Sequence, residues 1–322
     1  MRDQLLTAWR ARRALLVSPP CRISSFMQAL LSGLDARPVR IAPDADADRL
    51  NRAMTKGRVS ALIVPDLCAL SPGGSLQSQL GALLSLLSEA RESGIPLVIL
   101  CSCAGVYRAG GKPWAARESD MTGGETAEGL TQSILQMAAD GVSRGLMGDP
   151  VSVIIARHLP CLGCGHPAVA PYQAWCEAID ADTLVSVPHP ALQGVYIHPL
   201  DVCCGALALG ARYLLGDTQM TGAFNIGADA HNLMANRTAA LRFIRQSGGT
   251  RPIREIYPPL VPSLPLLDGS RAHFLCGLRT AIPGDEALCM LLELHRACKR
   301  GYPAEESVVR KQTQDYIQRL LR

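Results

Sequence analysis

Residues 95–107 read Ile-Pro-Leu-Val-Ile-Leu-Cys-Ser-Cys-Ala-Gly-Val-Tyr, an almost continuous apolar run that ends in small and polar residues. A short run that is apolar at nearly every position is typical of a strand buried on both faces of a parallel sheet. Similar runs occupy residues 14–17, 39–41, 61–64 and 151–156, and segments with helical spacing lie between them at 24–34, 76–92 and 126–144. This alternation predicts an α/β fold with a doubly wound parallel sheet.

The second half of the chain is less regular. After Pro160 the sequence becomes rich in glycine and proline, and helical spacing returns at residues 199–215, 237–246 and 284–300. We therefore expect a Rossmann-like nucleotide-binding portion over residues 1–160 and a smaller substrate-binding portion over residues 161–322. Some segments of the second portion are expected to return to the sheet.

The composition is that of a soluble globular protein. Of the 322 residues, 48% are apolar and 19% are charged, which excludes a disordered tail and a fibrous repeat. No apolar run reaches the ~18 residues that a membrane-spanning helix needs, so we expect no membrane segment. The net charge of +4 is too small to indicate a nucleic-acid-binding protein.

Twelve cysteines are spread along the chain from Cys21 to Cys298. The N-terminus is charged, and the first apolar run, residues 14–17, is too short for the core of a secretion signal. We therefore predict a cytoplasmic protein with reduced thiols.

One cysteine-rich segment has the spacing of a metal site. It reads Cys161-Leu-Gly-Cys164-Gly-His166, with Cys176 or His158 as a conceivable fourth ligand. Because no second well-spaced pair accompanies it, we predict no metal and keep a cysteine-bound metal module as an alternative. The tighter pairs Cys101/Cys103 and Cys203/Cys204 are predicted to be buried, small apolar side chains.

The first strand-to-helix turn reads Ser18-Pro-Pro-Cys-Arg-Ile-Ser24. Dinucleotide-binding folds carry glycines here, which let backbone amides and the helix N-terminus approach a pyrophosphate. Ser18, Cys21 and Ser24 occupy the glycine positions of a GxxGxxG spacing, and each adds a Cβ where a ligand would lie. The two prolines also remove amide donors, so a conventional pyrophosphate site is not expected.

Six strings share their order and spacing with one enzyme family. They are Trp9-Arg-Ala-Arg-Arg-Ala-Leu-Leu-Val17, Cys101-Ser-Cys-Ala-Gly-Val-Tyr107, Arg117-Glu-Ser-Asp-Met-Thr-Gly-Gly124, His198-Pro-Leu-Asp-Val-Cys-Cys-Gly205, Gly222-Ala-Phe-Asn-Ile-Gly-Ala-Asp229 and Leu267-Asp-Gly-Ser-Arg-Ala272 with Leu275-Cys-Gly-Leu278. Together they resemble the extended short-chain dehydrogenase/reductase family of NAD-dependent epimerases and dehydratases, and within it the CDP-glucose 4,6-dehydratases. The resemblance implies NAD as cofactor and a nucleotide sugar as substrate.

The resemblance also implies where the catalytic groups should stand. In that family a Tyr acts as the base, a Lys four residues later lowers its pKa, and a Ser or Thr shares the hydrogen bond. On this chain the Tyr position is Glu128, the Lys position is Gln132, and the hydroxyl position is Cys103 with Ser102 beside it.

Other family positions are replaced as well. The glycines of the first turn correspond to Ser18, Cys21 and Ser24, the phosphate-binding Arg to Gly194, and the nucleotide-loop Asn to Pro160. His198 and Asn225 stand within matching strings, and the resemblance makes them candidate substrate-binding residues.

These joint losses predict a pseudoenzyme that keeps the fold and serves as a partner subunit or a sugar-nucleotide binder. An alternative is an active NAD-dependent dehydratase or epimerase with altered catalytic residues, in which Glu128, Cys103 or the Cys161–His166 loop does the work.

The resemblance implies a homodimer, or a pairing with an intact paralogue, through the helix expected near residues 126–144. The apolar positions Leu130, Ile134 and Met137 on that helix fit either such a seam or the core.

Overall fold

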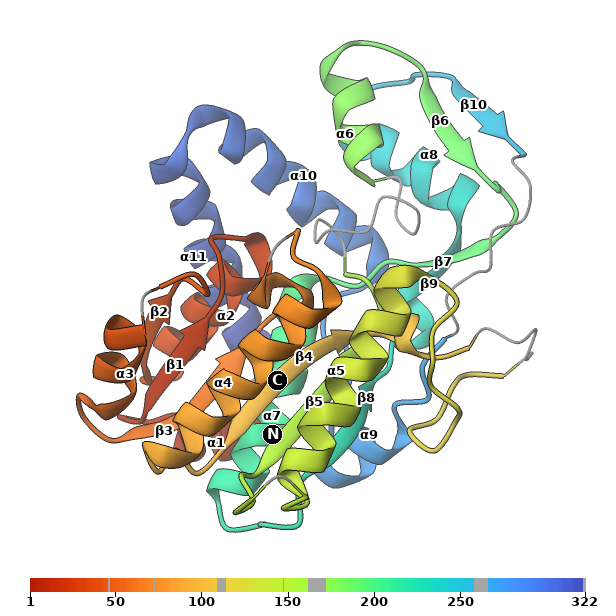
Figure 1. Cartoon of the computed structure of the whole chain (residues 1–322). Helices are drawn as coiled ribbons and strands as arrows, with labels where there is room; N and C mark the ends of the chain where they lie inside the picture. Colours follow the sequence, from red (N-terminus) through yellow and green to blue (C-terminus); the bar gives the residue numbers. More distant parts are fainter. Residues whose placement is uncertain are drawn as a thin grey trace.

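The computed structural model describes residues 1–45, 47–71, 73–108, 114–146, 148–161, 172–257 and 266–320. Within them a central sheet has six parallel strands in the order β2-β1-β3-β4-β5-β8. The strands are β1 (Arg13–Val17), β2 (Arg37–Ile41), β3 (Val59–Val64), β4 (Val98–Cys103), β5 (Val153–His158) and β8 (Gly222–Ile226). The predicted α/β fold with a doubly wound, Rossmann-like sheet is confirmed (Figure 1).

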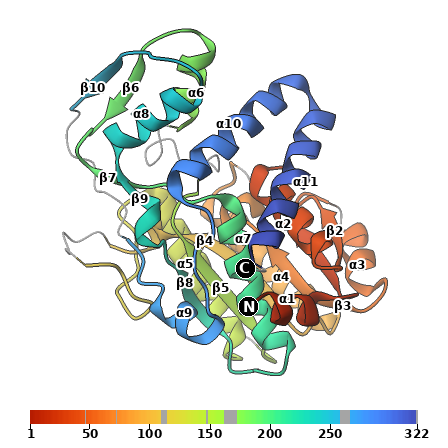
Figure 2. The ribbon, with the colours of Figure 1, turned by 180° about the vertical axis from the view of Figure 1, so that it is seen from behind.

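Helices cover both faces of the sheet, as Figures 1 and 2 show. One layer contains α1 (Arg2–Trp9), α2 (Arg22–Gly33) and α7 (Pro199–Leu214), and the other contains α3 (Ala47–Thr55), α4 (Leu76–Glu92) and α5 (Ala127–Ser143). Strand side chains alternate between the layers, so that Leu16 and Ile99 belong to the first apolar core and Leu15 and Leu100 to the second. Because both faces are covered, the strands can be apolar at every position.

Side-chain caps fix where two of these helices begin. The Thr126 hydroxyl accepts a hydrogen bond from the Gly129 amide at 3.0 Å, which starts α5. His198 Nδ1 accepts from the Leu200 amide at 3.1 Å, and Pro199 takes the first helical position of α7. Each cap satisfies a backbone donor that the first turn leaves free.

The remaining elements flank the sheet and form a small lobe. The antiparallel helices α10 (Gly284–Arg300) and α11 (Tyr302–Arg319) contact each other, and α11 also contacts α2. The lobe beyond the carboxyl ends of the central strands contains α6 (Tyr172–Asp180), β6 (Val185–Pro188), α8 (Asn236–Gln246) and β10 (Ile253–Ile256) (Figure 1). The short strands β7 (Gln193–Val195) and β9 (Leu233–Ala235) pair antiparallel, and α9 (Ser270–Cys276) contacts β8. No described helix is long and apolar enough to cross a membrane.

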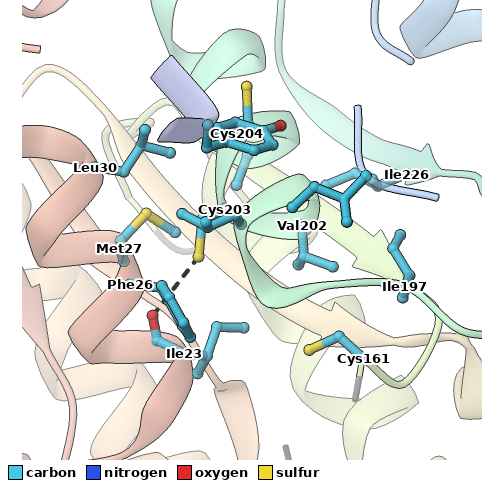
Figure 3. Close-up of a cluster of buried hydrophobic side chains, with 14 of the residues drawn as sticks. Ile23, Phe26, Met27, Leu30, Cys161, Ile197, Val202, Cys203, Cys204 and Ile226 are labelled. Atoms are coloured by element: carbon cyan, nitrogen blue, oxygen red, sulfur yellow. Dashed lines mark hydrogen bonds between the residues drawn. The ribbon is translucent and has the colours of Figure 1, made fainter. Parts of the chain in front are cut away.

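The contact between α2 and α7 closes one face of the sheet (Figure 3). Phe26 on α2 is fully buried and meets the His198 ring edge-on, with the ring centroids 5.0 Å apart. The Cys203 thiol lies 3.6 Å from the Ile23 carbonyl and donates a weak hydrogen bond to it. Cys203 and Cys204 are both buried here, which confirms their predicted role as small apolar side chains.

Truncating Phe26 tests how much this contact stabilises the fold. Phe26→Ala removes a fully buried ring and should lower the free energy of unfolding by about 3–5 kcal/mol. Phe274, whose side chain is 88% exposed, provides the control, and Phe274→Ala should change stability by less than about 0.5 kcal/mol. Urea unfolding of wild type, Phe26→Ala and Phe274→Ala measures both changes in the free energy of unfolding. Equal stabilities of the two variants would contradict the packing described here.

Candidate functional site

Strand order reverses between β1 and β3, and the loops that follow them diverge at this point. Folds of this type bind ligands in the crevice outside the carboxyl ends of the strands, at such a switch point. The residues at this edge are Ser18 after β1, Asp66 after β3, Cys103 at the end of β4 and His158 at the end of β5. The candidate site is built from these positions and from the start of α5.

The turn between β1 and α2 uses its polar groups internally. The hydroxyls of Ser18 and Ser24 both donate to the Pro19 carbonyl, at 2.9 and 3.1 Å. The Cys21 amide donates to the Ser24 hydroxyl at 3.1 Å, and the Cys21 sulfur in return caps the backbone at Ser24. Cys21 and Ser24 therefore form a capping box, and Ser18 joins them through the shared Pro19 carbonyl.

This turn does not fit the pyrophosphate of a dinucleotide. Pro19 and Pro20 have no amide hydrogen, and the Cys21 amide is engaged by Ser24. The exposed carboxylate of Asp66 follows the neighbouring strand, and a diphosphate in the crevice would meet this like charge. The residues present are therefore unsuited to hold NAD in the way the fold normally does.

Gln132 on α5 is bound to the end of β4. Its carboxamide oxygen accepts hydrogen bonds from the Ser102 hydroxyl at 2.6 Å and from the Cys103 amide at 2.8 Å. Its amide nitrogen lies 3.5 Å from a carboxylate oxygen of Glu128, one helical turn earlier. Gln132 is only 3% exposed, so this side chain joins two elements and is not open to a ligand.

A buried polar chain continues from this junction across the sheet. Gln136 donates to the Ser102 hydroxyl at 2.5 Å and accepts from Arg157 Nε at 2.8 Å. Arg157 Nη1 donates to the Tyr107 hydroxyl at 2.7 Å, and this hydroxyl donates to Asn225 Oδ1 at 2.8 Å. Strand register aligns Ser102, Arg157 and Asn225 in one row across β4, β5 and β8. The chain thus joins three strands and α5 and satisfies polar groups that burial would otherwise penalise.

The groups that could act in catalysis lack a suitable environment. Burial raises the pKa of the Cys103 thiol to about 11, with smaller increases from Glu128 and Asp66, so no thiolate is available at neutral pH. Burial also raises the pKa of Tyr107, which opposes its use as a base. The Glu128 side chain is exposed at the first turn of α5.

The predicted buried character of the Cys101/Cys103 pair is confirmed only for Cys101. Cys101 is fully buried, whereas Cys103 is partly exposed at the edge of the crevice. Burial raises the pKa of Cys101 to about 12, which keeps the thiol protonated.

The two candidate substrate residues, His198 and Asn225, are both buried, and they make different contacts. Asn225 accepts from Tyr107 and donates to the Ala116 carbonyl at 2.9 Å, so its carboxamide is bound at both ends. His198 lies on the α2 face, where it caps α7 and contacts Phe26. The structure therefore brings Ser102, Cys103, Glu128 and Gln132 together, links Asn225 to them through the buried chain and leaves His198 apart.

The sequence analysis does not identify Asp66, Gln136 or Arg157 as site residues. A charged residue inside an otherwise apolar strand is the one signal that could reveal Arg157, because an Arg is almost never buried without partners. Gln136 follows Gln132 by four residues, so the two side chains lie on the same face of the helix. This spacing identifies Gln136 as a site residue only once the hydrogen-bond partners of Gln132 are known.

The predicted absence of a metal site stays untested over the cysteine-rich loop. Cys161 is buried, but Cys164 and His166 lie outside the described residues. Among the described residues, no three His, Cys, Asp or Glu side chains gather closely enough to hold a metal ion.

Comparisons with known proteins give matches in structure only. No protein-family model and no curated protein matches the sequence. Similar solved structures include UDP-glucose 4-epimerase from Brucella ovis in complex with NAD, with 17% identity, a TM-score of 0.71 and coverage of 87% of this chain and 97% of that chain. dTDP-glucose 4,6-dehydratase from Bacillus anthracis in complex with NAD has 12% identity, a TM-score of 0.71 and coverage of 91% and 100%.

A third structure carries a nucleotide sugar. UDP-glucose 4-epimerase from Thermotoga maritima with UDP-glucose has 14% identity, a TM-score of 0.70 and coverage of 89% of this chain and 100% of that chain. At these identities the likeness establishes a shared fold, and function has to be argued from the site.

The pH dependence of stability tests the buried state of His198. Burial lowers its pKa from 6.5 to about 3, so its neutral form stabilises the fold above pH 6.5 and this contribution is lost as the pH falls toward 3. The loss amounts to at most about 1.4 kcal/mol per pH unit. His198→Asn keeps a cap for α7 and should show a shallower loss in urea unfolding between pH 7 and pH 4.

The exposed His273 provides the control, since His273→Asn should keep the wild-type slope. Identical slopes for wild type and His198→Asn would show that His198 is not a buried neutral group.

Proposed function

We propose that this chain is a pseudoenzyme related to the sugar-nucleotide epimerases and dehydratases, and that it binds a nucleotide sugar or a partner subunit without NAD-dependent chemistry. The observation that carries the proposal is the engagement of Gln132 with Ser102 and the Cys103 amide. A carboxamide has no proton to exchange near neutral pH, and this one is saturated by structural hydrogen bonds.

The cofactor argument supports the same conclusion independently. Transient oxidation of a sugar carbon needs a hydride acceptor, and in the Ser18–Ser24 turn two prolines lack an amide hydrogen while the Cys21 and Ser24 amides are engaged within the turn. The similar epimerase and dehydratase structures contain NAD, and in the family that the sequence resembles glycines stand at the positions of Ser18, Cys21 and Ser24.

The alternative of altered catalysis has weak chemical support. A nucleophilic Cys103 would need a lowered pKa, whereas burial raises it to about 11. Glu128 as a base would act from an exposed position on a poorly acidic alcohol. The class of ligand, a CDP-hexose or another nucleotide sugar, is part of this proposal.

The cofactor content of the purified protein tests the proposal. Mass spectrometry of the small molecules released by denaturation should find no NAD, and added NAD should give no heat in titration calorimetry. Turnover of CDP-glucose or UDP-glucose should be undetectable in the presence of NAD. Stoichiometric NAD together with turnover that Glu128→Gln abolishes would overturn the proposal in favour of altered catalysis.

We further propose that two copies of the chain pair through α5. The structure buries Leu135 and Ala139 on the inner face of this helix, whereas Leu130 and Met137 are 49% and 67% exposed on its outer face. Ile134 between them is partly buried. An exposed apolar stripe of this kind is costly to leave in water, and a second copy supplies the same stripe by symmetry.

A charge placed on the stripe tests the pairing. Leu130→Glu/Met137→Glu should convert a dimer to a monomer in analytical ultracentrifugation, because two pairs of carboxylates would be buried against apolar surface. Leu215→Glu, at a 45% exposed residue after α7, should leave the dimer intact. A wild-type monomer, or a dimer in the double variant, would contradict pairing through α5.

A further inference from the structure

Five arginines gather around a hollow at the amino ends of the first three strands. The hollow has a volume of about 630 Å³, and its lining includes Arg10, Arg12, Arg13, Arg37 and Arg58. Its lining comes from α1 and from the amino ends of β1, β2 and β3, at the edge of the sheet opposite to the crevice. These amino ends lie next to α1 and away from the small lobe (Figure 1). None of these arginines takes part in the candidate site.

Sheet register brings these residues together from three separate segments. Arg13 at the start of β1 pairs with Arg37 at the start of β2 on one side and with Val59 at the start of β3 on the other. Arg58 immediately precedes β3, and Arg12 immediately precedes β1. The convergence is a consequence of parallel pairing, because parallel strands place all their amino ends at one edge.

The positive charge of this cluster is poorly neutralised. Arg10 lies 3.9 Å from Asp35, and both side chains are about two-thirds exposed, so this pair is weak. Arg37 and Arg58 are exposed and form no ion pair with any described residue. Gathering five guanidinium groups costs free energy through like-charge repulsion, and folding gains little there in return.

Arg13 is held in place at the base of the hollow. Its Nη2 donates one long hydrogen bond, 3.5 Å, to the Ala53 carbonyl near the end of α3. Gly57 has a φ of +79°, and a Cβ at that position would lie 3.1 Å from Arg13 Nη1, so a glycine leaves room for the guanidinium. The Nε atom of Arg13 is buried and has no hydrogen-bond partner among the described residues. The donors of this side chain are therefore under-used, which is costly unless another acceptor binds nearby.

We propose that this hollow is a binding site for a chain of two or three phosphate groups, as in a nucleoside triphosphate or a free oligophosphate. Guanidinium groups form forked, charge-assisted hydrogen bonds with phosphate oxygens, and several of them on one ligand neutralise a polyanion. The volume is that of a small-molecule site. A nucleic acid would instead require a basic stripe that continues along the surface.

The site is independent of the proposed function. A ligand bound at the amino edge would lie on the far side of the sheet from the crevice, so the two sites can be occupied and mutated separately. If a variant loses binding at one site, ligand binding at the other site can still be measured.

Titration calorimetry at constant ionic strength, with tripolyphosphate and ATP as probes, tests the proposal. Wild-type protein should bind tripolyphosphate, and Arg37→Gln/Arg58→Gln should weaken binding about tenfold or more, since each change removes charge-assisted hydrogen bonds. Both arginines are exposed, so the variant should unfold in urea like wild type. Arg245→Gln/Arg254→Gln carries the same charge change on exposed residues of α8 and β10 and should bind like wild type.

ATP and tripolyphosphate also distinguish the two ligands that could supply the phosphate chain, a nucleotide and a free oligophosphate. Tighter binding of ATP than of tripolyphosphate would identify a nucleotide site, and equal binding would identify a site for the phosphate chain alone. The proposal is overturned if wild type does not bind tripolyphosphate, if the Arg37/Arg58 variant binds it as well as wild type, or if the control variant is weakened equally. Binding of a single-stranded oligonucleotide without measurable binding of tripolyphosphate would also overturn it.

Discussion

Burial of both faces of the parallel sheet is the constraint on which the rest of the structure depends. Apolar side chains that alternate between two cores, as Leu15 and Leu16 do, require a helical layer on each side. The Trp9 indole donates to the Leu207 carbonyl at 3.1 Å, which ties the first helix to α7 within one of these layers. With both faces covered, polar chemistry is confined to the two edges where the strands end, and the two edges of this sheet have different chemistry.

At the carboxyl edge, buried polar side chains satisfy one another's hydrogen bonds. Two buried hydroxyls, a guanidinium and two carboxamides satisfy one another in a chain that runs from Gln132 through Ser102, Gln136 and Arg157 to Tyr107. Such a network stabilises one packing of α5 against the sheet, and each removed member would leave a partner unsatisfied. A catalytic base in the same place would need an open face and a poised pKa, and a saturated network provides neither.

The two edges of the sheet carry different charged residues. At the carboxyl edge Asp66 follows β3 and Arg22 begins α2, whereas Arg13 and four further arginines line the hollow at the amino edge. Phosphate binding by folds of this kind normally relies on the carboxyl edge. Here a cluster of arginines lies at the other end of the strands, although the net charge of +4 gives no sign of it. The arrangement of charge therefore matters more than its total.

The sequence by itself predicted five of the six central strands and the covering helices α2, α4, α5 and α7, because an apolar run such as residues 95–101 can be buried only between two layers. It did not predict the covering helices α1 and α3. The positions Glu128 and Gln132 came from the family resemblance, and their role stays a prediction. The sequence did not determine α11, in which charged residues are as numerous as apolar ones, or β8, a short segment that begins at a glycine and contains Asn225. The tertiary structure alone decided that Gln132 binds Ser102, that His198 is buried against α2, and that arginines from three segments meet at one edge. Such contacts arise from strand order and register, which join residues far apart in the chain and leave no periodic signal in the sequence.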